Sequence, residues 1–480
     1  MKAPLWTVEA MVAATGAERA GPLPKAITGI SIDSRSVKAG QAFFAIRGDA
    51  HDGHDFVPAA LEQGAALAVV ARSRLNGYSG DAPLVVVDDV LEALRQIARA
   101  ARLRSPAKIV AVTGSVGKTS TKEALALALG ASDETHASAA SFNNHWGVPL
   151  SLARMAETAN YGVFEIGMNH AGEITPLVRM VRPHVAIITA VEPVHLEYLG
   201  SLEAIADAKA EIFLGLDPGG AAVICRDNPH YQRLQRRAEE AGVSNIVSFG
   251  EHGEAETRLL RCALHADCST VEALILGEPV TYKIGAPGRH LAINSLAVLT
   301  AARLLGADLA RAAVALAQQA PAAGRGTRIT LNFPKGRALL IDESYNANPT
   351  SMRAALALLG QAAVGPGGRR IAVMGDMLEL GLAGEDLHRD LVDAVRQHGI
   401  DLVYCAGPLM AALWEALPSA RRGGYAPTAT ELEPQVAAAI RPGDAVMVKA
   451  SNGSRMGPLV KALVQRHSVT KAPEPAPAQG

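Results

Sequence analysis

Short apolar runs alternate with helix-length amphipathic stretches along most of the chain. In the first part, apolar residues recur at helical spacing over 90–103, after four runs typical of strands. These runs are 29–33, 42–47, 66–71 and 84–87. The same alternation recurs over 108–320 and over 330–465. Because strands that alternate with helices form largely parallel sheets covered by helices, the pattern predicts an α/β fold.

Two breaks in this alternation divide the chain. Ser105-Pro106 interrupts it first, and the segment 318–328, QQAPAAGRGTR, interrupts it again. A chain of 480 residues is too long for one core, and about three domains are expected. We predict an N-terminal α/β domain at 1–106, a central parallel-sheet domain at 107–322 and a C-terminal domain at 323–467. The segment 468–480 is rich in Pro and Ala, and we expect a disordered tail there.

The third domain repeats the strand and helix alternation on a smaller scale. Its apolar runs are 338–342, 371–374, 402–405 and 445–448, each followed by a polar or glycine-containing turn. No G-x-G-x-x-G sequence follows these runs. We therefore predict a Rossmann-like domain without a dinucleotide fingerprint.

The segment 108–130, KIVAVTGSVGKTSTKEALALALG, has the parts of a phosphate-binding loop. An apolar run leads into a turn with two glycines, and Lys118-Thr119-Ser120 then open a helix. Glycines let the backbone approach a phosphate, and the N–H groups at the start of a helix point towards an anion. We expect Lys118 to reach the outer phosphates of a nucleotide and the Thr119 hydroxyl to bind Mg²⁺. The general P-loop pattern has a glycine where this chain has Val112.

Composition and charge narrow the class of protein. The 46 Lys and Arg residues nearly balance the 47 Asp and Glu residues, so we expect no nucleic-acid partner. The four cysteines form no C-x-x-C pair, which argues against a disulfide framework or a zinc site. No apolar run approaches the ~20 residues that span a bilayer, and no signal-type core is found near the N-terminus. The sequence therefore predicts a cytoplasmic protein with no membrane span.

Two polar side chains follow neighbouring apolar runs beyond the loop. Glu165 ends the run in 161–167, and His195 lies just after the run 185–191. Ligands of open α/β sheets collect at the carboxyl ends of the strands, so both side chains are expected to face the same crevice as the loop. A carboxylate and an imidazole placed there favour a metal site, although a strand-end glutamate can also be a surface or capping group.

Lys209 falls in the middle of an apolar stripe on a helix predicted over 201–216. Its ammonium can extend outward to water while its stem packs. Alternatively, burial lowers its pKa and leaves a neutral amine that captures CO₂ as a carbamate. A carbamate would supply anionic oxygen, the type of ligand that Mg²⁺ prefers.

Several polar loops are candidates for substrate binding. Asp33-Ser34-Arg35 and the loop from Arg47 to His54 can bind an anion or simply face solvent. Asn294, near the start of a helix, can hold an adenine edge, and Arg325 between two glycines can turn towards a neighbouring site. The turns after the third domain's strands are explained equally well by turn formation alone.

In its motifs, the chain resembles the Mur ligase family, the ATP-dependent amide ligases that build the peptidoglycan stem peptide. The family's form of the loop, T-G-x-x-G-K-T-[ST], matches TGSVGKTS and accounts for the missing glycine. The loop alone marks only a superfamily that includes folylpolyglutamate synthetases. The segments SFNNHWGVPLSL, SYNANPTSMRAAL and MGDMLELG are more specific. Glu343 departs from the family's pattern, in which a second Asp is expected.

The resemblance implies roles for individual residues. The central domain is expected to be a P-loop ATPase domain that binds ATP through Gly114, Ser115, Gly117, Lys118, Thr119 and Ser120. The metal sites are expected at Thr119, Glu165, His195 and carbamylated Lys209. Nucleotide contacts are expected from Asn294, Arg325, Asp342, Tyr345 and Asn346. The UDP-sugar end is expected at Ser34, Arg35, Arg47 and His54, and the muramoyl-peptide path at Asn143 and Asn144. The incoming dipeptide is expected near Asp376, Ser451, Asn452 and Arg455.

The activity that the resemblance implies is ATP-dependent joining of D-alanyl-D-alanine to a UDP-N-acetylmuramoyl-tripeptide, through an acyl phosphate. The expected partners are these small molecules, ATP and Mg²⁺, and the expected state is a monomer. The catalytic groups are expected to be Lys118, Glu165, His195 and Lys209, and the residues leave open which group accepts the amine proton. Closure of the domains is expected around Ser105 and Gly324. Two alternatives remain, a related ligase that adds a single amino acid and a P-loop nucleotide switch.

Overall fold

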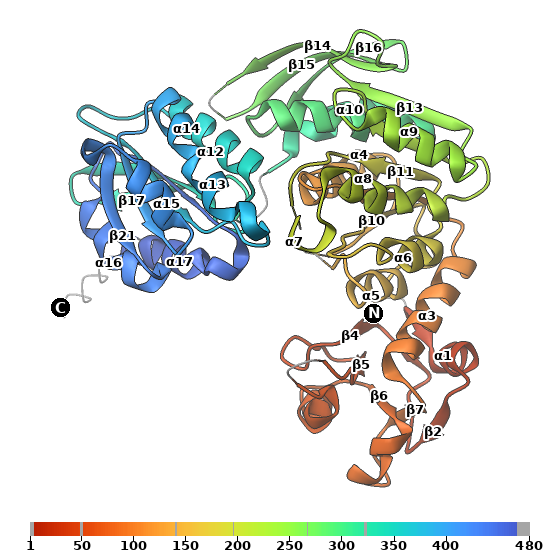
Figure 1. Cartoon of the computed structure of the whole chain (residues 1–480). Coiled ribbons are helices and arrows are strands. Elements are labelled where there is room, and N and C mark those ends of the chain that lie inside the picture. Colours follow the sequence, from red (N-terminus) through yellow and green to blue (C-terminus); the bar gives the residue numbers. More distant parts are fainter. Residues whose placement is uncertain are drawn as a thin grey trace, which may run out of the picture.

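The protein forms three α/β bodies arranged in sequence order (Figure 1). The computed structural model describes residues 4–48, 51–139, 142–194, 196–265, 267–320 and 324–467. Each body is built on its own sheet, which confirms the predicted α/β fold with a central parallel-sheet domain and two flanking domains. No helix in these ranges is both long and apolar enough to cross a bilayer. The predicted disordered tail, 468–480, lies outside the described residues.

The N-terminal body contains a sheet of five described strands in the order β2-β7-β6-β5-β4. The strands from β7 to β4 pair in parallel, and β2 pairs antiparallel to β7 at the edge. Its sheet strands are β2 (Glu18–Ala20), β4 (Gly29–Ser31), β5 (Gln41–Phe44), β6 (Leu67–Ala71) and β7 (Leu84–Val87). Its helices are α1 (Val8–Thr15), α2 (Val57–Glu62) and α3 (Val90–Arg104), and β1 (Trp6–Thr7) pairs separately with β3 (Ala26–Ile27).

The central body contains the largest sheet, with nine described strands in the order β16-β15-β14-β13-β12-β11-β8-β10-β9. Its parallel strands are β8 (Lys108–Thr113), β9 (Thr135–Ala137), β10 (Tyr161–Glu165), β11 (Val185–Ile188), β12 (Ala221–Cys225) and β13 (Asn245–Gly250). Helices α4 (Lys118–Gly130), α10 (Arg289–Leu304) and α11 (Leu309–Ala315) pack on one face. Helices α5 (Gly147–Ala153), α6 (Ile174–Val181), α8 (Leu202–Ala210) and α9 (Tyr231–Glu240) pack on the other. Because β8 pairs with both β10 and β11, the carboxyl ends of these three strands lie together.

An antiparallel extension, which the sequence analysis did not predict, completes this sheet. It consists of β14 (Thr257–Leu264), β15 (Ser269–Ile275) and β16 (Glu278–Ile284). Along β15, buried and partly buried residues alternate strictly, because one face packs on α10 and the other is partly open. This period of two is typical of antiparallel strands with one covered face. The prediction of a βα repeat throughout 108–320 was therefore wrong for this segment.

The C-terminal body has six described strands in the order β17-β18-β22-β19-β20-β21. The strands are β17 (Thr327–Phe333), β18 (Gly336–Glu343), β19 (Arg370–Gly375), β20 (Leu402–Ala406), β21 (Arg422–Ala426) and β22 (Ala445–Lys449). All pairs are parallel except β17 with β18. The helices are α12 (Pro349–Gln361), α13 (Gly384–Arg389), α14 (Leu391–Gln397), α15 (Met410–Ala416), α16 (Ala429–Ala439) and α17 (Met456–Arg466).

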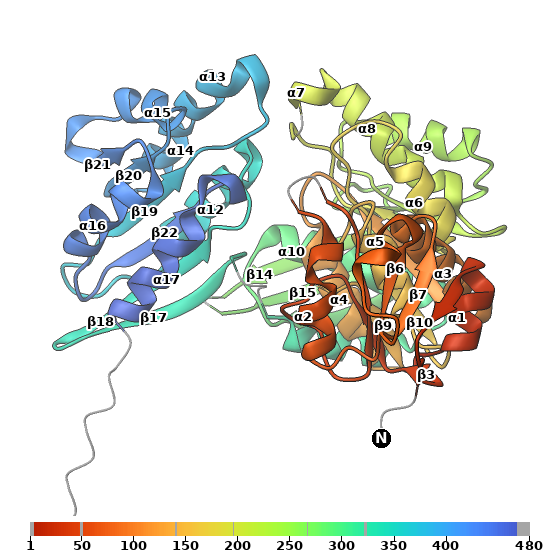
Figure 2. The same cartoon turned by 90° about the horizontal axis from the view of Figure 1, so that it is seen from below.

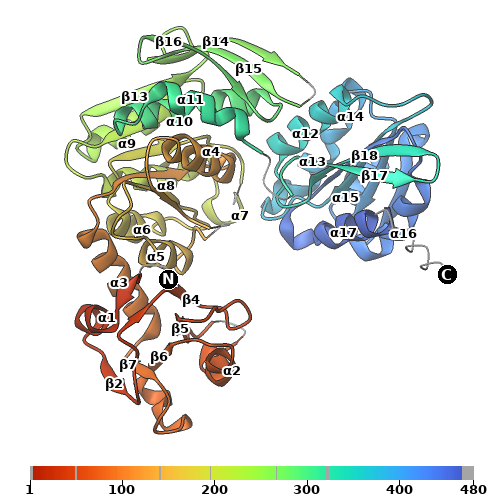
Figure 3. The same cartoon turned by 180° about the vertical axis from the view of Figure 1, so that it is seen from behind.

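The two junctions between the bodies differ in kind. Helix α3 runs from the N-terminal sheet onto the central body, where it packs against α5 (Figure 3). One apolar cluster continues from Trp6 through α3 into the central sheet, and Ser105 at the junction is buried. The Trp6 indole N–H donates to the Ala153 carbonyl at 2.9 Å, and the Arg104 guanidinium lies 3.4 Å from the centre of the Trp6 ring. Ser105 is therefore part of a packed joint, and this packing does not fit the expected hinge there.

The C-terminal body has separate apolar clusters of its own. It faces the central body at α7 (Leu196–Leu199) (Figure 2), and a hydrogen bond from Thr350 to Glu192 also joins the two bodies. The connecting residues Gly324 and Gly326 have φ values of 72° and 96°, in the left-handed region that favours glycine. The connection near Gly324 therefore needs glycine for its backbone conformation, and the expected closure there stays a prediction.

Candidate active site

The loop between β8 and α4 has the geometry of a phosphate cradle. Gly114 and Gly117 have φ values of 152° and 82°. A Cβ atom on Gly117 would lie 2.6 Å from the Asn294 amide nitrogen, and one on Gly114 would collide with the Thr189 hydroxyl. Thr189 donates to the Val116 carbonyl at 2.6 Å and so holds the loop against β11. Both glycines are therefore required by the close packing of the loop, and Asn294 lies directly over it.

Lys118 is the first residue of α4 and turns back over the loop. Its ammonium donates to the carbonyl of Gly114 at 2.6 Å and, over a longer 3.4 Å, to that of Ser115. Burial lowers the pKa of Lys118. The negative charge of Glu165 opposes this shift, and the positive charge of Arg325 adds to it. The ammonium therefore lies among loop atoms, where the outer phosphates of a nucleotide would meet it.

Thr119, Glu165 and Asn143 form a buried hydrogen-bonded group beside Lys118. The Thr119 hydroxyl donates to Glu165 Oε2 at 3.0 Å, and the Asn143 side-chain amide donates to Glu165 Oε1 at 2.7 Å. Glu165 is 1% exposed at the end of β10. Because both carboxylate oxygens have donors, Glu165 is fixed in orientation, and this arrangement favours a role as a ligand.

Lys209 is almost fully buried, with 2% of its surface exposed. Burial, together with the nearby positive charge of Lys118, holds the pKa of Lys209 well below its ordinary value. The predicted helix 201–216 ends earlier than expected, at Ala210, and continues as a 3-10 turn over Glu211–Gly215. The turn tightens there because Glu211 accepts hydrogen bonds from the Thr175 main chain and side chain at the start of α6, at 3.0 and 2.9 Å. Lys209 thus lies on the last turn of α8.

The predicted metal site draws on Thr119, Glu165, His195 and Lys209. His195, a predicted ligand, lies outside the described residues. Among the residues that the structure describes, no three His, Cys, Asp or Glu side chains gather as a metal-binding group. Of the predicted ligands that the structure describes, Thr119 and Glu165 have oxygen atoms that can bind Mg²⁺. This ion is often held by one or two protein oxygens together with substrate phosphates and water.

The predicted nucleotide residues come from two bodies. Asn294 lies on α10 of the central body, and the other four lie in the C-terminal body or at its start. The Arg325 guanidinium lies 4.5 Å from the centre of the Tyr345 ring, and the Tyr345 N–H donates to the Gly324 carbonyl at 3.1 Å. The Asp342 carboxylate accepts from the Ser344 hydroxyl at 2.6 Å, and Asn346 is exposed. Arg325 and Tyr345 are therefore in contact beside Gly324, and Arg325 is near enough to Lys118 for its positive charge to lower the pKa of that lysine.

Two of the predicted cradle residues have side chains that are bonded within the protein. The Ser115 hydroxyl donates to the Glu192 carbonyl at 3.0 Å and accepts from the Glu192 N–H at 2.9 Å. The Ser120 hydroxyl donates to the Gly117 carbonyl at 3.1 Å. Neither contact was expected, and each holds the loop in shape.

The predicted sugar-binding residues of the N-terminal body have different surroundings. Arg35 is exposed and pairs with Asp33 at 2.8 Å, and Arg47 is exposed on a loop whose residues 49 and 50 are outside the described residues. Ser34 is half-buried beside Arg35. His54 is buried, with Nδ1 bonded to the Asp52 carboxylate at 2.6 Å and Nε2 accepting from the Ala71 N–H at 2.9 Å. Both ring nitrogens of His54 are thus used by the fold, whereas Arg35 and Arg47 are open to solvent.

Asn144 lies just before α5 in this structure. Its side-chain oxygen accepts from the N–H groups of Trp146 and Gly147, at 3.2 and 2.9 Å, at the start of α5. Its predicted place on the peptide path stays a prediction, while neighbouring Asn143 joins the group around Glu165.

The predicted dipeptide residues lie on adjoining loops of the C-terminal body. Asp376 is buried and accepts from the Met410 N–H at 2.8 Å, and burial raises the pKa of its carboxyl. The Ser451 hydroxyl accepts from the Leu378 N–H at 3.0 Å, which joins the loops after β19 and β22. Asn452 and Arg455 are exposed, and Arg455 has a φ of 53°, which is uncommon for a residue with a side chain. Asn452 and Arg455 are therefore the two of the four that face solvent.

Glu343, the departure from the family's pattern, has a clear partner. Its carboxylate lies 3.2 Å from the ammonium of Lys449, which is 3% exposed and also donates to the Asn346 carbonyl at 3.0 Å. A buried ammonium requires a counter-charge. Glu343 therefore neutralises Lys449 and fixes the loop that carries Asn346, a role that the sequence did not reveal.

His388, which the sequence analysis did not single out, holds the loop that carries Asp376. The ring is fully buried, Nε2 accepts from the Met377 N–H at 2.9 Å, and Nδ1 lies 2.6 Å from the Gly384 carbonyl. This pattern requires a proton on Nδ1 only, so the ring is neutral. Burial accordingly lowers the pKa of His388.

Because its pKa in the folded protein is depressed, His388 should make the C-terminal body less stable in acid. Below the ordinary histidine pKa of about 6.5, His388 takes up a proton in the unfolded chain but not in the folded protein. The stabilising contribution of His388 is therefore complete above that pH and is lost as the pH falls further. Denaturant unfolding at pH 7.5 and pH 5 measures this loss. We expect a smaller loss in His388→Gln, whose side-chain oxygen can still accept from Met377. An equal loss in both proteins would contradict this role.

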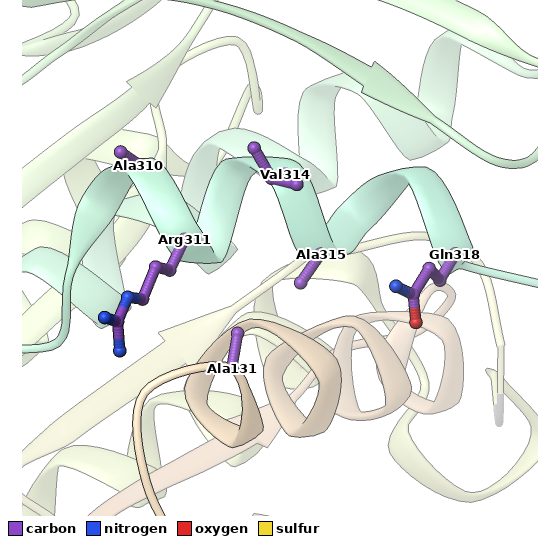
Figure 4. Close-up of a pocket in the computed structure, with 6 residues that line it drawn as sticks. All are labelled: Ala131, Ala310, Arg311, Val314, Ala315 and Gln318. Carbon is purple, nitrogen blue, oxygen red and sulfur yellow. The ribbon is translucent and has the colours of Figure 1, made fainter.

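A shallow hollow lies at the opposite end of α4 (Figure 4). It is lined by Ala131, Ala310, Arg311, Val314, Ala315 and Gln318. The length of a 13-residue helix, about 20 Å, separates it from the cradle. Its lining is mostly small or aliphatic, so it is not the nucleotide site.

Comparison with known proteins identifies the family. The Mur ligase family catalytic domain profile matches residues 26–102, the middle domain profile matches 112–302, and the glutamate ligase domain profile matches 324–452. The UDP-N-acetylmuramoyl-tripeptide--D-alanyl-D-alanine ligase of Rickettsia prowazekii is 33% identical over 90% of this chain and 94% of its own length.

Two solved structures are similar over nearly the whole chain. A crystal structure of MurF from Acinetobacter baumannii is 29% identical with a TM-score of 0.82, and the match covers 96% of this chain and 100% of that one. The MurF ligase of Thermotoga maritima in complex with ADP is 25% identical with a TM-score of 0.73, covering 91% and 97%. The similarity extends through all three bodies, so this chain belongs to the Mur ligase family.

Proposed function

We propose that this protein is an ATP-dependent ligase that joins D-alanyl-D-alanine to UDP-N-acetylmuramoyl-tripeptide in the synthesis of peptidoglycan precursors. The observation that carries the proposal is the similarity to ligases of that name over nine-tenths of the chain. The cradle around Lys118 and the buried group around Glu165 supply the chemistry that such a reaction requires. The substrates are small molecules.

The residues around the cradle fit ATP and Mg²⁺. Gly114 and Gly117 leave no room for a Cβ and keep the loop backbone open to a phosphate. Thr119 and Glu165 offer hard oxygen ligands, and we propose His195 and Lys209 as further ligands. A magnesium ion held there would neutralise phosphate charge. We assign the nucleoside end to Arg325, Tyr345, Asn346, Asp342 and Asn294, of which Asn294 lies over the cradle and Arg325 contacts the Tyr345 ring.

The reaction must overcome the repulsion between two anions. A carboxylate oxygen of the tripeptide attacks the γ-phosphorus of ATP, the bond to the β-phosphate oxygen breaks, and ADP leaves. Lys118 is placed to offset the negative charge that gathers on the transferring phosphoryl group. The dipeptide amine then attacks the acyl-phosphate carbonyl, loses a proton, and phosphate leaves as the amide forms.

The dipeptide would enter from the C-terminal body, past Asn452 and Arg455, and the UDP-sugar would lie along Arg35 and Arg47. Asp376 and Ser451 would act by shaping the loops, since both are bonded within the fold. His54 would do the same in the N-terminal body. Because Arg325 and Tyr345 are in contact beside Gly324, where the C-terminal body joins the central one, binding of the nucleotide there would favour closure of the C-terminal body.

A panel of acceptors tests the proposal. Phosphate release is measured with UDP-N-acetylmuramoyl-tripeptide, ATP and Mg²⁺, and with D-alanyl-D-alanine, meso-diaminopimelate, L-lysine or glutamate as acceptor. We expect turnover with the dipeptide and little with the single amino acids. Turnover with a single amino acid instead would indicate a different Mur-type or folylpolyglutamate-type ligase. Nucleotide-dependent binding of a partner, without ADP formation, would indicate a nucleotide switch.

A further inference from the structure

Glu192 lies at the point where the cradle meets the C-terminal body. It follows β11, and both of its main-chain polar groups are bonded to the Ser115 hydroxyl, at 2.9 and 3.0 Å. The Ser115 N–H donates in turn to the Ala190 carbonyl at 2.8 Å. The segment after β11 is therefore locked onto the phosphate-binding loop through one serine.

The side chain of Glu192 reaches in the other direction. Its carboxylate accepts a hydrogen bond of 2.6 Å from the Thr350 hydroxyl, across the gap to the C-terminal body. Thr350 is in the first turn of α12, after Asn348 caps the helix and Pro349 begins it. The N–H groups at the start of a helix favour a negative charge, so the carboxylate is well placed. The mechanism proposed above gives Glu192 no part.

A second, longer hydrogen bond joins the same segment to the C-terminal body. The Glu197 N–H donates to the Glu379 carbonyl at 3.4 Å. Glu379 has a φ of 62°, which is uncommon for a residue with a side chain. The C-terminal body shares no apolar cluster with the central body among the described residues. The hydrogen bond at Glu192 is therefore a short side-chain contact between the two bodies.

We propose that Glu192 is a positioning residue that ties the C-terminal body to the phosphate-binding loop. Ser115 transmits any shift of the loop to the Glu192 main chain, and the carboxylate passes it to α12. The helix α12 begins at Pro349, shortly after Tyr345 and Asn346, so the same connection affects where the proposed nucleotide contacts lie. The kinetic part of this inference rests on the proposed ligase activity, and the structural part does not.

The test compares Glu192→Ala, Thr350→Val and the double variant with the full-length protein by small-angle X-ray scattering. We expect each single variant to broaden the distribution of interdomain distances. The double variant should add nothing further, because the two substitutions remove the same hydrogen bond. Glu192→Gln should stay close to the unchanged protein, since its amide oxygen still accepts from Thr350. Glu203→Ala, which removes an exposed carboxylate from α8, is the matched control.

The enzyme assay adds a second readout. We expect both single variants to raise KM for the acceptor by about 3- to 10-fold, the size of one lost hydrogen bond, with the dissociation constant for ADP within about twofold. Unchanged scattering in both single variants, or additive effects in the double variant, would overturn the proposal. Absence of turnover in the unchanged protein would refute the proposed activity, while the scattering comparison would still decide the role of Glu192.

Discussion

Replacing Lys118 with alanine should lower the rate of ADP formation by about 10²-fold or more. The ammonium is the positive charge held directly over the cradle, 2.6 Å from the Gly114 carbonyl. When the tripeptide carboxylate approaches the γ-phosphate, two anions meet, and the ammonium of Lys118 is bonded to this loop. Steady-state assays of ADP formation, with saturating D-alanyl-D-alanine, measure the loss.

Lys108 offers a matched control for this variant. It lies at the opposite end of β8, where its ammonium donates to the Leu305 carbonyl at 2.9 Å. Lys108→Ala removes the same charge from the far end of the strand that leads into the loop, yet we expect its rate to stay within about twofold of the unchanged protein, because surface contacts contribute little. A Lys118→Ala enzyme that melts normally and still forms ADP at nearly full rate would remove Lys118 from the mechanism.

The second large effect is expected at Lys209. Its buried amine has a pKa held well below the ordinary value by burial and by the charge of Lys118, so a fraction is neutral and able to attack CO₂. Attack on CO₂ would form an N–C bond, release a proton and leave a carbamate anion near Lys118. We predict that Lys209→Ala lowers the rate by about 10²-fold or more, as loss of a positioned charge does. Added formate or acetate should restore part of the activity.

Labelled CO₂ separates a carbamate from a plain amine. With ¹³CO₂, we expect a carbamate signal in the NMR spectrum of the unchanged protein and none in Lys209→Ala. Lys122 is an internal comparison, since it is also fully buried but pairs with Glu123 at 2.7 Å and donates to the Ser138 carbonyl at 2.8 Å. Full activity in CO₂-free buffer, together with a spectrum lacking the signal, would show that Lys209 acts unmodified.

The cradle and its neighbours were accessible from the sequence because each has a local signature. The glycines at 114 and 117 and the Lys118-Thr119 pair fix a strand, a turn and a helix in one short segment. The position of Glu165 followed from the rule that parallel strands end at one edge, and the structure places its carboxylate 3.0 Å from Thr119. The burial of Lys209 followed from its place on an apolar stripe.

Contacts between distant segments were not accessible in this way. The partner of Lys449 is Glu343, more than a hundred residues away, and the pairing arises only because β18 and β22 are neighbours in the sheet. His388 and Glu192 are similar cases, since an isolated histidine or glutamate in a sequence carries no mark of its partner. The strands β14 to β16 were missed for another reason, because the βα repeat before them was extended past its true end.

The shared apolar core of the N-terminal and central bodies also bears on how the protein unfolds. A body whose core is continuous with its neighbour's cannot expose its own apolar residues without disturbing the other. The first two bodies should therefore melt together as one cooperative unit, and the C-terminal body, with its own clusters, as a second. The enzyme has three domains when it is divided by their roles in catalysis, whereas in thermal denaturation it should unfold as two cooperative units.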